Sequence, residues 1–160
     1  ALSDWLDARL IADAQATLIH NDFKLDNVIL NPNTHAPVAV IDWDMGTRGD
    51  PRWDLAVMLG YWTEAGDPEA MLELNQMPTA GHGFPSREAI ANYYAELSGV
   101  DMTGFHFIRV LAVFRAAVIF RQLYIRYVSG DTDDPRFVKF GESADGLLNF
   151  AIDIANEKYF

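Results

Sequence analysis

The segment His20-Asn21-Asp22-Phe23-Lys24-Leu25-Asp26-Asn27, followed further along the chain by Ile41-Asp42-Trp43-Asp44, carries most of the information about the fold. Between the two segments lie two apolar runs rich in β-branched residues, Val28 to Leu30 and Val38 to Ile41. The turn-forming residues Asn31 to His35 join these runs. The sequence therefore predicts a β-hairpin flanked by polar side chains.

The predicted hairpin would bring these polar side chains together. Asn27 immediately precedes the first strand and Asp42 immediately follows the second, so antiparallel pairing makes them neighbours. Asp22 lies on the loop that enters the same edge. Two carboxylates and one amide oxygen then meet there, and such hard oxygen ligands suit Mg²⁺. We expect the side-chain oxygens of Asn27 and Asp42 to lie about 5 Å apart or less.

Helical patterns dominate the rest of the chain, so we expect an α+β fold that is mainly helical, in one domain spanning residues 1–160. The segment Phe105 to Val128 is apolar on nearly every face and predicts a central buried helix. An extended piece is expected at Thr17 to His20. Asp50 as N-cap and Pro51 at the first helical position predict a helix that runs to Tyr61. The other expected helices are Leu2 to Ala14, a short helix that starts at Gly66-Asp67-Pro68, Ser86 to Leu97, and Phe137 to Lys158.

Composition excludes several classes of function. The 160 residues carry a formal net charge of -11, which argues against non-specific binding of nucleic acid. The chain has no cysteine, which excludes disulfides and thiol chemistry and favours a cytoplasmic setting. No apolar stretch reaches the roughly 18 residues of a membrane helix, and the best candidate, Val110 to Phe120, contains Arg115.

The spacing His20-x-Asp22-x-x-x-x-Asn27, then a hairpin, then Asp42 resembles the catalytic loop and metal-binding segment of kinases. Further segments are similar to aminoglycoside phosphotransferases, in particular the bacterial branch similar to domains fused to acyl-CoA dehydrogenases. The resemblance covers most of the chain and implies the C-terminal lobe of a protein-kinase-like fold. The segments that carry it are Asp42 to Ala56, Tyr61 to Pro68 and Tyr124 to Phe137.

The resemblance implies phosphoryl transfer from ATP, with Mg²⁺, to a hydroxyl of a small molecule. Asp22 would orient the acceptor hydroxyl and take its proton. Asn27 and Asp42 would hold Mg²⁺ on the nucleotide phosphates. Lys24 would bind the nucleotide and neutralise charge on the transferred group, although many antibiotic-modifying relatives lack a lysine there. The acceptor stays open: a hydroxyacyl thioester, an aminoglycoside, choline, homoserine or a sugar, with a non-antibiotic metabolite favoured.

This sequence departs from the protein-kinase pattern in its metal-binding segment. Trp43 and Asp44 replace the Phe and Gly of Asp-Phe-Gly, and the Gly replacement is common among small-molecule relatives. Asn21 stands where relatives often carry Gly or Arg. These differences argue against a protein kinase with a flipping activation segment.

Supporting roles are expected for two residues. His20 should pack and hydrogen-bond under the loop rather than act as a base or metal ligand. Asp54 resembles the family's buried aspartate that hydrogen-bonds the catalytic-loop backbone. Asp50 is better explained as a helix cap, and Asp26 as a solvated side chain.

Arginines on the predicted central helix admit two interpretations. Four arginines lie on this helix, Arg109, Arg115, Arg121 and Arg126, and Arg115 and Arg126 share roughly one face. A structural ion pair with Asp54 or with an acid on the last helix is favoured over a site for a substrate phosphate or carboxylate. The histidines at 35, 82 and 106 lack the spacing of zinc ligands. Trp53, Tyr61 and Trp62 are expected in the core or a pocket wall.

The glycine-rich loop and lysine strand that cover ATP phosphates in kinases have no counterpart in these 160 residues. The chain also opens directly in a helical pattern at Ala1, so we expect a fragment whose N-terminal lobe precedes it. The isolated lobe is expected to be inactive and to self-associate through its exposed interface. Two alternatives remain open: a non-catalytic binding or scaffolding module, and a metal-dependent hydrolase using His20, Asp22 and Asp42.

Overall fold

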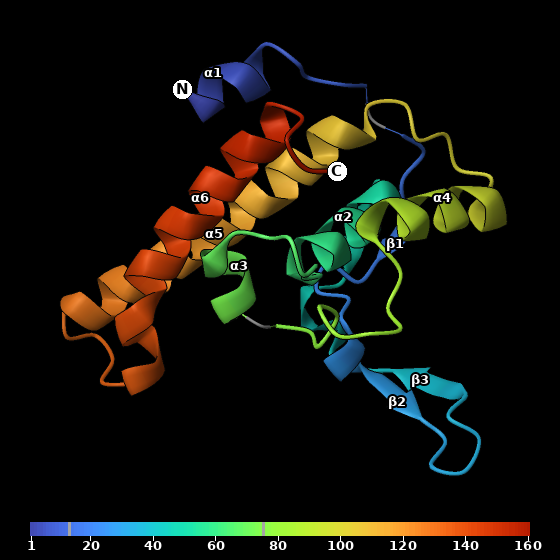
Figure 1. Ribbon diagram of the computed structural model, residues 1–160, viewed down its shortest axis with the longest axis horizontal. Helices are drawn as coiled ribbons and strands as arrows, with labels where there is room; N and C mark the ends of the chain where they lie inside the picture. The colour runs from blue at the N-terminus through green and yellow to red at the C-terminus, as the bar shows by residue number, and fades with distance from the viewer. Residues whose placement is uncertain (13, 75) are drawn as a thin grey trace.

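The computed structural model describes residues 1–12, 14–74 and 76–160 as a mainly helical α+β fold. Two long helices, α5 (Phe105–Val128) and α6 (Phe140–Ala155), run side by side, and α2 (Arg52–Tyr61) packs against another side of α5 (Figure 1). This arrangement confirms the prediction of a central helix at Phe105–Val128. An apolar sequence on nearly every face is needed because neighbours cover α5 on two sides.

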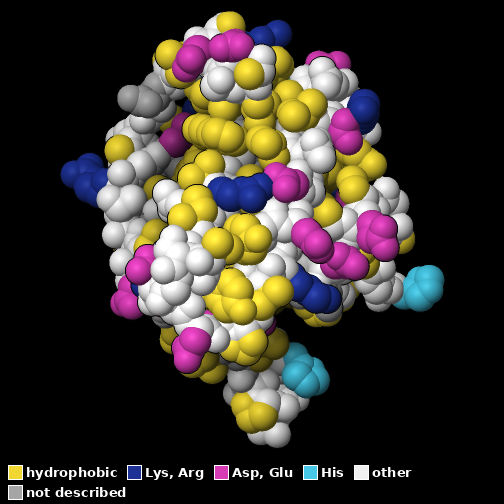
Figure 2. Space-filling view, turned by 90° about the vertical axis from the view of Figure 1, so that its left-hand side faces the viewer, with side chains coloured by type: hydrophobic (Ala, Val, Ile, Leu, Met, Phe, Trp, Pro, Cys, Tyr) yellow, Lys and Arg dark blue, Asp and Glu magenta, His cyan; other side chains and the backbone are white. Residues whose placement is uncertain are grey.

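The predicted hairpin is present and projects away from the helices. Strand β2 (Val28–Leu30) pairs antiparallel with β3 (Pro37–Val40), with a bulge between Ile29 and Leu30. The hairpin lies at the bottom of the molecule in Figure 1. In the space-filling view of Figure 2 it forms a narrow protrusion below a broad area of hydrophobic side chains.

A second strand pair was not fully predicted. Strand β1 (Thr17–Ile19), which lies in the expected extended piece, pairs antiparallel with β4 (Thr47–Gly49), which the sequence did not predict. Strand β4 was missed because its pairing is long-range and its own residues carry no strand pattern. Gly49 allows a close approach there: a Cβ at this position would lie 2.8 Å from Cδ1 of Ile19, so the end of the Ile19 side chain would have to shift.

The apolar core has two parts that share α5. One part lies between α5, α6, the short helix α3 (Glu69–Leu74) and the N-terminal helix α1 (Leu2–Asp7). The other lies between α2, the N-terminal half of α5 and helix α4 (Arg87–Ser98). Because α2 belongs to the second part, the core fixes the helix that supports the predicted catalytic loop.

Helix α1 is shorter than the expected Leu2 to Ala14. It ends at Asp7, and Ile11 instead packs against Gly104 and the second core. Tertiary packing thus overrides the local helical periodicity. Residue 13, inside the expected range, lies outside the described residues.

The boundaries of the other helices are close to those expected. Ser86 caps α4, accepting a hydrogen bond from the Ala89 N–H at 3.1 Å. Helix α2 begins at Arg52 with Pro51 as N-cap, one residue later than predicted, although Oδ1 of Asp50 does accept from the Arg52 N–H. The last expected helix is divided into a 3-10 turn at Pro135–Lys139 and α6.

Candidate active site

The loop from His20 to Asn27 connects β1 to β2, and its first residue is a buried anchor. Nε2 of His20 donates to the Ile41 carbonyl at 2.8 Å, and Nδ1 accepts from the Asp22 N–H at 3.3 Å. The two contacts use both ring nitrogens and require the neutral Nε2–H tautomer. His20 also lies 4.6 Å from the Trp43 ring, measured between centroids. These contacts fit the structural role expected for His20, which stays a prediction.

Asp54, in the first turn of α2, is hydrogen-bonded to the backbone of the same loop. Its carboxylate accepts from the backbone N–H of His20 at 2.7 Å and from that of Asn21 at 2.6 Å. These bonds fit the expected role of Asp54 as a support for the loop backbone, and that role stays a prediction. A half-buried carboxylate needs such donors, because desolvating an unpaired charge is costly.

Asn21 connects three segments around the site, a role that the sequence did not reveal. Its Oδ1 accepts from Trp53 Nε1 at 2.7 Å, and its Nδ2 donates to the Met45 carbonyl at 3.3 Å. Its φ of 67° lies in the left-handed region, which Asn tolerates better than most residues. The loop is therefore joined both to α2 and to the segment after Asp42.

Asp22 and Lys24 form an ion pair on the loop. Lys24 Nζ lies 2.9 Å from Asp22 Oδ2, and the two side chains are 22% and 23% exposed, so solvent still reaches both. The structure thus brings the predicted catalytic pair together at one accessible point.

Tyr61, expected only as core or pocket wall, lies beside this pair. Lys24 Nζ is 5.8 Å from the centroid of its ring. Burial, with the Asp22 carboxylate as the next cause, raises the pKa of Tyr61 to about 12. Asp54 and Tyr61 lie about two turns apart on nearly the same face of α2, a spacing that could have identified Tyr61 from the sequence.

The two predicted metal ligands lie at adjoining strand ends. The Ile41 N–H donates to the Asn27 carbonyl at 2.9 Å. Asp42 is the next residue after Ile41, so its backbone lies close to that of Asn27. Asn27 is buried, and its Nδ2 donates to the Asp22 carbonyl at 2.9 Å, so Oδ1 is the atom left for a metal. Asp42 is exposed and adopts a left-handed φ of 63°. The separation of their side-chain oxygens stays a prediction.

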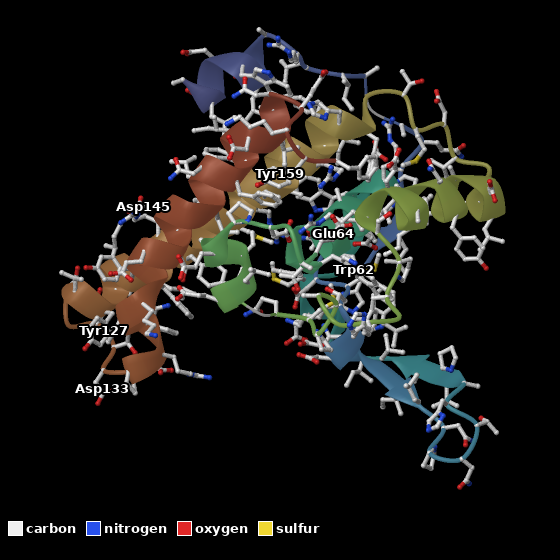
Figure 3. The ribbon with its side chains drawn as sticks, in the orientation of Figure 1. Trp62, Glu64, Tyr127, Asp133, Asp145 and Tyr159 are labelled. Atoms are coloured by element: carbon white, nitrogen blue, oxygen red, sulfur yellow. The ribbon has the colours of Figure 1, made fainter. Side chains whose placement is uncertain are left out.

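The arginines of α5 have different partners. Arg121 pairs with Asp145 on α6, which Figure 3 shows at the outer edge of that helix. Arg115 instead donates to the Asn21 carbonyl at 3.4 Å and lies over the Trp53 ring. The expected pairing with an acid of the last helix is therefore found for Arg121, while Arg115 contacts the catalytic loop rather than Asp54.

Arg87, which the sequence did not single out, fixes the end of α2 that carries Tyr61. Its side chain is 1% exposed and pairs with Asp67 and, at 3.3 Å, with Glu64. Its Nε donates to the Trp62 carbonyl at 2.9 Å (Figure 3 labels Trp62 and Glu64 at the centre of the molecule). Arg87 therefore caps α2 from the start of α4.

Residues 1–90 of the 160 match the family described as "Phosphotransferase enzyme family". The chain belongs to this phosphotransferase family. The match includes the whole loop, the hairpin, Asp42 and α2.

The phosphotransferase chain is also similar to parts of longer proteins. "Acyl-CoA dehydrogenase family member 10" of Mus musculus is 28% identical over 161 residues, covering 99% of this chain and 15% of the mouse protein. "Acyl-CoA dehydrogenase family member 11" of Rattus norvegicus is 33% identical over 134 residues, covering 81% of this chain and 17% of the rat protein. The chain thus spans only a small part of these relatives.

A solved structure supports the same fold. A crystal structure from Ralstonia eutropha, described as an aminoglycoside phosphotransferase, superposes with a TM-score of 0.80 at 24% identity. The superposition covers 98% of this phosphotransferase chain and 48% of the other. In the part of the chain that the structure describes, no helix is both long and apolar enough to span a bilayer.

Proposed function

We propose that this chain is the catalytic lobe of an enzyme that transfers the γ-phosphoryl group of ATP to a hydroxyl of a small molecule. The observation that carries the proposal is the Asp22–Lys24 pair, 2.9 Å apart on a loop that Asp54 holds by two backbone hydrogen bonds. Such positioning is the main source of catalysis in phosphoryl transfer, which needs little covalent chemistry from the protein.

Asp22 would act on the acceptor. Its carboxylate accepts a hydrogen bond from the acceptor hydroxyl, orients that oxygen for in-line attack and takes its proton as the new bond forms. Lys24, already beside Asp22, places a positive charge where the transferred group carries negative charge. Tyr61 borders the same point and would shape the space that the acceptor occupies.

The donor set at the hairpin edge fits Mg²⁺. Asn27 and Asp42 provide one amide oxygen and one carboxylate, and Mg²⁺ is usually held by one or two carboxylates together with substrate phosphates. The hydrogen bond from Asn27 Nδ2 to the Asp22 carbonyl leaves Oδ1 free for this purpose. When bound, Mg²⁺ supplies charge neutralisation at the phosphates. The contribution of the chain is to hold these two oxygens at adjoining strand ends.

The second lobe is part of the proposal. Around the hairpin edge, six large apolar side chains are each at least 43% exposed: Ile29, Leu30, Val38, Ile41, Trp43 and Met45. An exposed apolar surface of this kind is typical of an interface. We assign it to an N-terminal lobe that would hold the nucleotide against Asn27 and Asp42. Without that lobe the surface would favour self-association.

A small metabolite is the proposed acceptor. The relatives named for acyl-CoA dehydrogenases make a hydroxyacyl thioester one class to assay, and aminoglycosides, choline, homoserine and sugars form the comparison set. The test uses the intact protein with ATP, Mg²⁺ and each acceptor, and follows ADP release.

The matched variants for this assay are Asp22→Asn and Asp26→Asn. Both remove a carboxylate from the same loop, but Asp26 is exposed. We expect turnover to fall by orders of magnitude in the first and to stay within about twofold in the second. Equal turnover in the two variants would refute the role of Asp22. Release of phosphate from a phosphate ester in the absence of nucleotide would instead favour the metal-dependent hydrolase.

A further inference from the structure

A cavity of about 220 Å³ lies between α4 and the N-terminal part of α5, away from the Asp22 loop. Its walls are mostly apolar, formed by Ala91, Met102, Phe105 and Phe160, and three nitrogen-bearing side chains, Asn92, His106 and Arg109, also line it. Figure 1 shows the C-terminal end of the chain beside this part of α5. The volume is below the roughly 300 Å³ at which pockets for drug-sized ligands begin, so the cavity suits a small molecule.

Arg109 is a buried cation that faces this cavity. It is only 2% exposed, and within residues 1–12, 14–74 and 76–160 no acceptor is hydrogen-bonded to its guanidinium. Its closest aromatic contact is the Phe160 ring, with 4.7 Å from the guanidinium carbon to the centroid. A buried charge without a partner is strongly unfavourable, so the position is one that an anion would stabilise.

The nearby acids do not provide that partner. Glu64 and Asp67 are both bound directly to Arg87. Burial, with the charge of Arg87 as the next cause, lowers the pKa of Arg109 to about 9, while the charges of Glu64 and Asp67 act in the opposite direction; the guanidinium remains charged at neutral pH. A positive charge therefore faces the cavity under ordinary conditions.

His106 adds a second unused polar atom. In the described part of the chain, its Nε2 is fully buried and has no hydrogen-bond partner. Burial, followed by the charge of Arg109, lowers the pKa of His106, which keeps the imidazole neutral near pH 7. In the neutral imidazole this atom is a hydrogen-bond donor in one tautomer and an acceptor in the other.

We propose that this cavity is a binding site for a small monocarboxylate with an apolar body. The guanidinium of Arg109 offers two parallel N–H donors that match a carboxylate, which would supply the acceptors that Arg109 lacks. The Met102, Phe105 and Phe160 walls suit a hydrocarbon tail. Phosphate fits less well, because its second negative charge and further acceptors would have to be buried against these apolar walls.

This site is distinct from the proposed phosphotransfer site. Arg109 and Arg115 lie about 120° apart around α5 by helix periodicity, and it is Arg115 that contacts the catalytic loop at Asn21. No residue of the Asp22–Asp42 site lines the cavity. Binding can therefore be measured without nucleotide, and its failure would leave the phosphotransferase proposal untouched.

The experiment is calorimetric titration of the intact protein with butyrate, benzoate, butyramide and inorganic phosphate. We expect saturable binding of at least one carboxylate, no binding of the neutral amide, and phosphate affinity at least about tenfold weaker than that of the carboxylate. Absence of saturable binding for both carboxylates, or equal binding of butyramide or phosphate, would overturn the assignment.

Variants locate the binding. Arg109→Met keeps side-chain length and should weaken carboxylate binding at least about tenfold, while Arg121→Met, which removes a surface arginine of the same helix, should leave it unchanged. Ala91→Leu should fill the cavity and weaken carboxylate binding while leaving the charge of Arg109 in place. Thermal unfolding shows which variants remain folded, and either folded cavity variant suffices as a test. Unchanged affinity in a folded Arg109→Met or Ala91→Leu protein would contradict the proposal.

Discussion

The backbone N–H of His20 donates to Oδ2 of Asp54 at 2.7 Å, although 34 residues separate the two in sequence. Through this bond, and the one from the Asn21 N–H to Oδ1 of Asp54, helix α2 fixes the position of the loop that carries Asp22. The same helix places Tyr61 beside Asp22 and Lys24. A single core helix therefore positions both the backbone and one wall of the site.

Replacing Asp54 should loosen the loop. Asp54→Ala leaves two backbone N–H groups without their acceptor, and we expect a loss of about 2 kcal/mol or more of unfolding free energy, with lower turnover. Asp54→Asn keeps one acceptor oxygen and should lie between this variant and the wild type. Urea unfolding measures the effect, with Asp145→Ala as a surface control expected to change stability by less than about 1 kcal/mol. Equal effects of Asp54→Ala and Asp145→Ala would contradict the account.

Two substitutions at Asn21 separate backbone strain from side-chain bonding. Both Asn21→Gly and Asn21→Ala remove the bonds to Trp53 and Met45. Only glycine adopts the φ of 67° without strain, so the alanine variant should be less stable by about 1 kcal/mol. Denaturant unfolding of the pair is the measurement. If the alanine variant equals or exceeds the glycine variant in stability, the left-handed conformation of this residue is wrong.

Tyr61 predicts a change of stability at high pH. Its pKa is raised to about 12 in the folded protein, so folding favours the protonated phenol. This contribution is complete below the unfolded pKa near 10 and is lost as the pH rises toward 12, because the unfolded state binds fewer protons in that window. The wild type should therefore lose about 2 kcal/mol more than Tyr61→Phe between pH 9 and pH 12. Parallel stability curves for the two proteins would show that Tyr61 is not shielded as described.

The buried Arg87 predicts a large effect far from the loop. Arg87→Met leaves Asp67 buried without its partner and should cost about 3 to 5 kcal/mol, whereas the double variant Arg87→Met/Asp67→Leu should recover much of this loss. Arg121→Met is the exposed control, with an expected cost under about 1 kcal/mol. No recovery in the double variant would mean that Arg87 acts through packing or the Trp62 carbonyl rather than through charge.

Much of this architecture could be predicted from local sequence. The hairpin, the α2 start near Asp50-Pro51 and the whole of α5 follow from turn chemistry, capping and apolar periodicity. The neighbouring positions of Asn27 and the segment before Asp42 follow from antiparallel pairing alone.

The remaining features depend on contacts between distant segments. Strand β4 forms because it pairs with β1. Helix α1 ends early because the Ile11 side chain packs against Gly104. Likewise, the roles of Asn21 and Arg87 depend on partners such as Trp53 and Asp67, which periodicity cannot connect to them. For Asp54, the apolar helical surroundings and the family resemblance both predicted a support for the loop, and its two hydrogen bonds to the loop backbone fit that prediction.

Asp42 tests the metal assignment separately from the acceptor. Asp42→Ala removes one of two proposed oxygen ligands and should weaken Mg²⁺-dependent nucleotide binding by the intact protein. Asp44→Ala, a neighbouring exposed carboxylate, is the control and should bind nucleotide normally. Isothermal titration with ATP and Mg²⁺ gives both affinities. Equal affinities would remove Asp42 from the site.

The central claim is that Asp22 promotes transfer of a phosphoryl group to a hydroxyl, and ³¹P NMR of the intact protein with ATP, Mg²⁺ and hydroxylated metabolites tests it most directly. The account predicts a new phosphomonoester signal that grows as the γ-phosphate signal of ATP falls. It also predicts that Asp22→Asn slows this growth by orders of magnitude while nucleotide binding persists. An ester signal that grows equally fast with Asp22→Asn, or inorganic phosphate as the product with every acceptor, would contradict the account.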